Sequence, residues 1–186
     1  MTDIQNLIRR IDQLESRNAI TELGTRYAMA CDEHNMPALL ALFTDDAEFT
    51  SPSGVMQATG KAEIEAMFIR MFKIRGPAYH WTHDHIIEFD QQNPDKAHGI
   101  VLSHAETSPD GEGSLAAMKY EDHYARVDGK WKYAHRSIHF LYYTPISEYG
   151  QILQRKDRLV VGDKRLPADY PEALSCWQEF IKTHNT

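Results

Sequence analysis

The stretch MKYEDHYARVDGKWKYAHRSIHF, residues 118–140, decides the fold because it reads as two long strands joined by a tight turn. Its central dipeptide, Asp128-Gly129, is typical of a β-hairpin turn. Two further turn signals precede it, Asn93-Pro94-Asp95 and Pro109-Asp110-Gly111. They divide the region into four strands of an antiparallel meander, which we predict at residues 78–90, 97–107, 114–127 and 131–143.

The residues before this meander have a helical period. Apolar residues at three- and four-residue steps predict a first helix, namely Ile4, Leu7, Ile8, Ile11 and Leu14. A second helix is expected from about Ser16 to Ala30, and a third from Asn35, with Pro37 in its first turn, to Asp45-Asp46. Helices followed by an antiparallel meander are typical of an α+β fold, so we expect a sheet that curves around the helices and leaves a pocket.

Smaller elements connect these helices to the meander. A short strand is expected at Ala47–Thr50, and Ser51–Gly54 reads as a turn. Gly60 then introduces a fourth helix, which Gly76-Pro77 ends because both residues interrupt helical backbone.

The chain from Thr144 onward changes in character. It contains several prolines, a charged run at residues 155–158 and a short predicted helix at Ala173–Ile181. We therefore divide the chain into an α+β core at residues 1–143 and a C-terminal extension at residues 144–186. The extension is expected to pack on the core or on a neighbouring subunit.

Composition narrows the function. The chain has 186 residues and a formal net charge of −7, and no segment is strongly basic, so nucleic-acid binding is not expected. Two cysteines, Cys31 and Cys176, are too few for a disulfide framework, which favours a reduced, cytoplasmic location. We find neither a signal peptide nor an apolar run of the ~18 residues that a membrane span needs.

The strand predicted at residues 78–90 is rich in histidine. Because side chains alternate along a strand, His80 is expected on one face and the pair His83 and His85 on the other. A His-x-His pair is the spacing of a metal site, but no third and fourth ligand are evident. We therefore predict no metal and no other cofactor, and polar residues under helices or at a subunit interface are the simpler interpretation.

Tyr27 and Asp32 lie at the end of the second predicted helix. Five residues is not a same-face helical spacing, so Asp32 must lie at the helix end or just beyond it for both to reach one pocket. On the residues alone, a core aromatic at Tyr27 and an exposed acid at Asp32 are the simpler interpretation, since most charged side chains are merely solvated.

Two segments resemble SnoaL-like proteins of the nuclear transport factor two-like superfamily. One is AITELGTRYAMACDEHNMPALLALFTDDAEF, residues 19–49, and the other is the hairpin at residues 118–140. In the hairpin the residues at the family's spacings are Tyr120, Asp122, Tyr124, Arg126, Asp128, Gly129, Trp131 and Arg136. The resemblance covers roughly residues 15–143 and implies a cone-shaped α+β barrel, with N-terminal helices packed in a strongly curved antiparallel sheet.

Metal-free lyases of this superfamily, bile-acid 7α-dehydratase and hexachlorocyclohexane dehydrochlorinase, resemble the chain at the site. The first has a tyrosine and an aspartate that Tyr27 and Asp32 match, and a catalytic histidine that aligns with His80. The Asp–His pair of the second matches Asp32 and His80. Asp84, where many members have asparagine, and Trp81 beside the histidine depart from the pattern and affect the substrate more than the pair.

The resemblance implies His80 as base, Asp32 as its partner and Tyr27 as hydrogen-bond donor. A neutral histidine can take a proton from carbon near neutral pH, and a carboxylate on its other nitrogen fixes the tautomer. A tyrosine can donate to a carbonyl or a departing hydroxyl. Further substrate contacts are expected from Asp84, Trp81, His104, Arg136 and His139.

The expected function is a cofactor-free lyase, foremost a dehydratase, acting on an apolar cyclic small molecule such as a steroid or an aromatic metabolite. The same groups could instead serve an isomerase or a polyketide cyclase. A non-catalytic ligand carrier, or a subunit like the β-subunits of ring-hydroxylating dioxygenases, is the interpretation of another class. A homo-oligomer, dimer or trimer, is also expected because the N-terminal apolar stripe and the open sheet face need cover.

Overall fold

The computed structural model describes residues 3–184. Its helices are α1 (Asp3–Asp32), α2 (Met36–Ala41), α3 (Lys61–Arg75) and α4 (Ser175–His184), with short 3-10 segments η1 (Pro109–Gly111) and η2 (Ile146–Gln154). Its strands are β1 (Phe43–Thr50), β2 (Gln57–Thr59), β3 (Tyr79–Phe89), β4 (Lys96–Thr107), β5 (Ser114–Val127), β6 (Lys130–Pro145), β7 (Leu159–Val161) and β8 (Lys164–Leu166).

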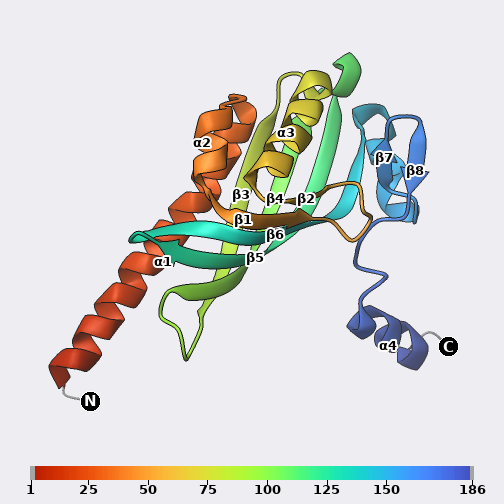
Figure 1. Cartoon of the computed structure of the whole chain (residues 1–186). Coiled ribbons are helices and arrows are strands. Elements are labelled where there is room, and N and C mark those ends of the chain that lie inside the picture. The colour runs from red at the N-terminus through yellow and green to blue at the C-terminus, as the bar shows by residue number, and fades with distance from the viewer. Residues whose placement is uncertain (1–2, 185–186) are drawn as a thin grey trace.

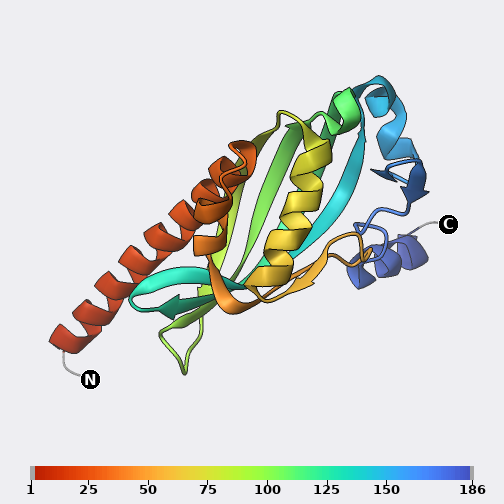
Figure 2. The ribbon, with the colours of Figure 1, turned by 45° about the horizontal axis from the view of Figure 1, so that its top comes forward.

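The sheet has the strand order β2-β1-β6-β5-β4-β3, and β3 to β6 form the predicted antiparallel meander. β1 returns to pair in parallel with β6, a connection that the sequence pattern did not indicate. The strands bend around α2, α3 and the C-terminal half of α1 (Figures 1 and 2), which confirms the α+β class with N-terminal helices and an open, curved sheet.

The core lies between the helices and the face of the sheet that they cover, which we call the inner face. Aromatic rings from separate elements meet there: Tyr27 of α1, Phe68 of α3 and Tyr133 of β6 are each at most 3% exposed. The ring of Tyr27 stands edge-on to Tyr133 and to Phe68, with centroids 5.9 and 6.3 Å apart. Such edge-to-face pairs stabilise a core by ~0.5–1.5 kcal/mol beyond their burial.

The two N-terminal helices expected from the sequence are one continuous helix, α1, so that prediction was wrong. Neither proline nor glycine interrupts the chain near Ser16, whose side chain is buried and accepts a hydrogen bond from Arg126 at 3.4 Å. The first half of α1 extends past the sheet (Figure 2). Its apolar stripe is exposed, at Ile4, Leu7, Ile8, Ile11 and Leu14.

The third predicted helix was too long. The side chain of Asn35 caps α2 by accepting from the N–H of Ala38 at 3.2 Å, but α2 ends at Ala41. The predicted stop, Asp45-Asp46, lies within β1 instead. Pairing of β1 with β6 explains the difference, because Phe43 is fully buried opposite Tyr133 and so is drawn into the sheet.

A β-bulge at Asp84 changes the side-chain alternation of β3. Asp84 has a φ of 44°, and the register to β4 shifts between His83 and His85. The expectation that His83 and His85 share a face was therefore wrong. His85 lies toward the inner face, where its Nε2 is 3.0 Å from the hydroxyl of Tyr124, whereas His83 lies on the outer face, 3.0 Å from a nitrogen of His104.

The C-terminal extension is tied to the sheet by Arg158, which is 2% exposed. Its guanidinium donates to the Leu141 carbonyl at 2.8 Å and to both carboxylate oxygens of Glu172 at 2.6 and 2.7 Å. The adjacent β7 pairs with β6 at Leu159 and Tyr143, so the extension continues the sheet locally. No helix within residues 3–184 is both long enough and apolar enough to cross a membrane.

Candidate active site

His80 and Asp32 come from different elements and meet at the inner face of the sheet. Asp32 is the last residue of α1, and His80 lies at the start of β3. One carboxylate oxygen of Asp32 accepts from the backbone N–H of His80 at 2.9 Å, and the other is 2.5 Å from ring atom Nδ1. The side chains are only 7% (His80) and 16% (Asp32) exposed, so bulk water competes little for this contact.

This contact assigns roles to the two ring nitrogens. An ionised carboxylate can only accept a hydrogen bond, so Nδ1 of His80 carries the proton. In the neutral ring Nε2 is then the basic atom. No hydrogen bond from another described residue occupies Nε2 of His80, and its side chain lines a small cavity of about 80 Å³. The pair can therefore accept a proton from a molecule in that cavity.

Tyr27 lines the same small cavity, together with Tyr120, Met118 and Thr107. Burial raises the pKa of Tyr27 well above its usual value of 10, so its hydroxyl stays protonated and can donate. The guanidinium of Arg136 lies over the Tyr27 ring, 4.2 Å from its centroid, and this cation opposes the rise in the pKa.

Arg136 is fully buried and paired within the core. It donates to both oxygens of Asp122 at 2.8 and 2.7 Å, and Asp122 also accepts from the hydroxyl of Tyr124 at 2.9 Å. Its guanidinium is also 4.1 Å from the ring centroid of Tyr120 and 4.0 Å from that of Tyr133. Arg136 thus acts on the cavity chiefly through the aromatic rings that it supports.

The other predicted contact residues lie away from this cavity, on the outer face or the bulge of the sheet. Trp81 is 43% exposed and borders an outer-face hollow with His104. Asp84 lies 3.2 Å from a ring nitrogen of His83 at the bulge, and His139 lies 3.6 Å from the carboxylate of Glu121. The structure therefore brings together Tyr27, Asp32 and His80 and separates them from these four residues.

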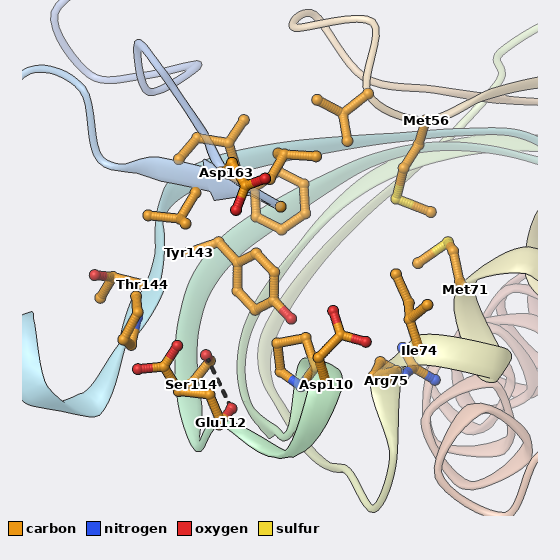
Figure 3. Close-up of a pocket in the computed structure, with 18 residues that line it drawn as sticks. Met56, Met71, Ile74, Arg75, Asp110, Glu112, Ser114, Tyr143, Thr144 and Asp163 are labelled. Atoms are coloured by element: carbon orange, nitrogen blue, oxygen red, sulfur yellow. Dashed lines mark hydrogen bonds between the residues drawn. The ribbon is translucent and has the colours of Figure 1, made fainter.

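Figure 3 shows a larger cavity, with a volume of about 430 Å³. The two share the lining residues Met56, Met71, Arg75, Phe140 and Tyr143. One wall of the large cavity comes from the extension, at residues 159–163, and another from η1. The walls are mainly apolar, so the combined hollow suits a molecule with a hydrophobic body.

Tyr143 and Arg75 are polar lining residues that the sequence analysis missed. Tyr143 reaches the inner face because the register of β6 shifts near Leu141, and its hydroxyl is 2.8 Å from Thr107 Oγ1. Arg75 ends α3, where a cation is ordinary, so nothing in the sequence marked it as a cavity residue. Among residues 3–184 no group of three or more His, Cys, Asp or Glu side chains is arranged to hold a metal ion.

Comparison with known proteins identifies relatives in sequence and in fold. The chain is 26% identical over 147 residues to γ-hexachlorocyclohexane dehydrochlorinase of Sphingobium indicum, covering 74% of this chain and 88% of that protein. The crystal structure of a hexachlorocyclohexane dehydrochlorinase (LinA) of type 2 superposes with a TM-score of 0.68 at 25% identity, covering 74% of this chain and 93% of that one.

A candidate scytalone dehydratase from Novosphingobium aromaticivorans has the same fold, with a TM-score of 0.70 at 19% identity over 89% of this chain and 99% of that one. The family model for the SnoaL-like domain matches residues 12–137. That range holds Tyr27, Asp32 and His80 but leaves out the whole C-terminal extension. Because the match spans well over half of the sequence, the chain belongs to the SnoaL-like domain family.

Proposed function

We propose that this protein is a cofactor-free lyase, foremost a dehydratase, that acts on an apolar cyclic small molecule. The observation that carries the proposal is the double contact of Asp32 with the ring and the backbone of His80 beside a cavity. The chain is similar to dehydrochlorinases, whose name denotes an elimination reaction, and this similarity supports the same class of reaction.

In the proposed reaction Nε2 of His80 takes a proton from a carbon next to the one that bears the leaving hydroxyl. The electrons of the C–H bond form the new double bond while the C–O bond breaks. The negative charge of Asp32 stabilises the imidazolium that forms. Tyr27, kept protonated by burial, donates a hydrogen bond to the departing oxygen. The proton held by His80 then passes to that oxygen, so water leaves and the protein returns to its starting state.

The test is the variant His80→Gln, which keeps a polar side chain but removes the base. Dehydration of a panel of hydroxysteroids and hydroxyketones should fall by about 10²–10⁴ in kcat. Asp32→Asn should fall as well, and the double variant should fall little further, because the two residues act as a unit. His83→Gln, on the same strand but the outer face, is the matched control.

Wild-type turnover by His80→Gln would disprove this mechanism. Measuring water release against double-bond migration separates dehydration from isomerisation, since an isomerase returns the proton to another carbon. Ligand binding with no turnover of any panel member by the wild-type protein would favour the carrier interpretation.

A further inference from the structure

Arg75, the last residue of α3, is a buried cation with no carboxylate ion pair among residues 3–184. It is 8% exposed and lines both the small and the large cavity. The other buried arginines are each held by two hydrogen bonds to a carboxylate, Arg136 by Asp122 and Arg158 by Glu172. Arg75 differs from them because the groups that it contacts, the Cys31 carbonyl and the Phe72 ring, are neutral.

Those neutral partners leave donors of the guanidinium unused. One NH₂ group of Arg75 donates to the carbonyl of Cys31 at 3.0 Å, and the guanidinium lies 5.1 Å from the ring centroid of Phe72. Its Nε is buried without a hydrogen-bond partner. The carbonyl end of α3 offsets part of the charge. A guanidinium has five N–H donors, however, so one facing a cavity is a ready site for an oxygen acceptor.

The surroundings favour a neutral acceptor over an anion. Asp110, Glu112 and Asp163 line the large cavity (Figure 3), and none of them forms an ion pair with Arg75. Three carboxylates oppose the entry of a further negative charge. A carbonyl oxygen carries no net charge yet accepts well from a guanidinium, so a ketone on an apolar body fits these walls best.

We propose that Arg75 binds a carbonyl oxygen of the substrate while the apolar body of the substrate fills the large cavity. This inference rests on the proposed function, because it names the substrate class of the same site. Arg75 donates a hydrogen bond to the carbonyl of Cys31, the residue before Asp32, and Asp32 in turn contacts His80. These contacts place the cation close to the base. A cation on the carbonyl stabilises the negative charge that builds up on its oxygen while His80 removes a proton from the adjacent carbon.

The test measures binding, so that it stands apart from turnover. The probes are 2-acetylnaphthalene and its isostere 2-isopropenylnaphthalene, in which a CH₂ group replaces the oxygen, titrated against the full chain by fluorescence. The wild-type protein should bind the ketone about tenfold more tightly or better. Arg75→Met should remove this preference and leave affinity for the hydrocarbon unchanged. Arg70→Met, an exposed arginine of the same helix, should behave as wild type.

Three further measurements complete the test. The carbonyl stretch of bound 2-acetylnaphthalene should shift to lower frequency in the wild-type protein and return in Arg75→Met. Arg75→Lys keeps the positive charge but lacks the planar guanidinium with its paired N–H donors, so its preference for the ketone should be intermediate. This variant replaces Arg75→Met if Arg75→Met does not fold. His80→Gln should retain the full preference, which distinguishes this proposal from the proposed catalysis.

Equal affinity of the wild-type protein for both probes, or an undiminished preference in Arg75→Met, would overturn the proposal. A third probe, 2-naphthoate, tests the choice of a neutral acceptor. If it binds more tightly than the ketone in the wild-type protein, the site is one for anions and the assignment of a carbonyl substrate is wrong.

Discussion

His85 illustrates at the scale of one residue how the inner face of the sheet controls protonation. Its Nε2 is 3.0 Å from the hydroxyl of Tyr124, and burial lowers its pKa from 6.5 to about 4. The neutral ring is therefore the form that the folded protein accommodates. Protonation of His85 must oppose folding, because the unfolded chain takes up the proton more readily than the folded one.

We expect the free energy of unfolding to be highest above the unfolded pKa of about 6.5 and to fall as the pH drops toward 4. Between pH 7 and pH 5, His85 should lower the free energy of unfolding by roughly 1 kcal/mol, after allowance for its partial exposure. Urea unfolding at the two pH values measures it. His85→Gln should reduce the difference, while His184→Gln on the exposed α4 should not; an unchanged difference in His85→Gln would contradict this assignment.

At the scale of elements, the close approach of β3 and β4 next to the bulge depends on Gly99 of β4. An added Cβ at Gly99 would lie 2.4 Å from the backbone oxygen of Ile86 and 3.3 Å from the Tyr124 ring. The oxygen belongs to the sheet backbone and the ring is buried in the core, so neither can move aside easily. Close approach of the two strands at this point therefore requires glycine.

Gly99→Ala should lower the free energy of unfolding by about 2–4 kcal/mol, because overpacking against backbone forces the strands apart. Chemical denaturation checks the value. The matched control is Gly150→Ala in η2, where an added Cβ meets nothing within 4 Å and stability should not fall. Equal stability of both variants would show that β3 and β4 can separate without cost.

At the scale of the whole molecule, the C-terminal extension becomes a wall of the large cavity because Arg158 holds it there. Residues 159–163 follow that arginine directly and line the cavity opposite α3. The family model ends before them, at residue 137. We therefore expect this segment to influence which molecules fit, while the family-wide part of the chain supplies Tyr27, Asp32 and His80.

Arg158→Ala should lower the free energy of unfolding by about 2–4 kcal/mol, since it leaves Glu172 and several backbone carbonyls without their donor. It should also speed proteolytic cleavage within residues 150–170. Arg155→Ala removes an exposed ion pair with Asp157 and should change stability by less than about 1 kcal/mol. If limited proteolysis cut both variants at the same rate, Arg158 would not be what fixes the extension.

The sequence by itself determined the elements that depend on local pattern. Turn signals such as Asp128-Gly129 defined β4 to β6 to within a few residues, because hairpin register follows from turn geometry. The resemblance at residues 19–49 and 118–140 identified the family correctly. It also singled out Asp32 and His80, which are 48 residues apart and lie in hydrogen-bond contact.

Only the tertiary structure decided what depends on distant parts of the chain. The pattern could not place the bulge at Asp84, because its positive φ is set by pairing with β4, and so His85 was assigned to the wrong face. Nor could it show that Trp81 and His104 lie outside the cavity, or that Arg75 lies inside it without a counter-ion. Local sequence fixes backbone preference, but which side chains share a cavity depends on how the sheet curves around the helices.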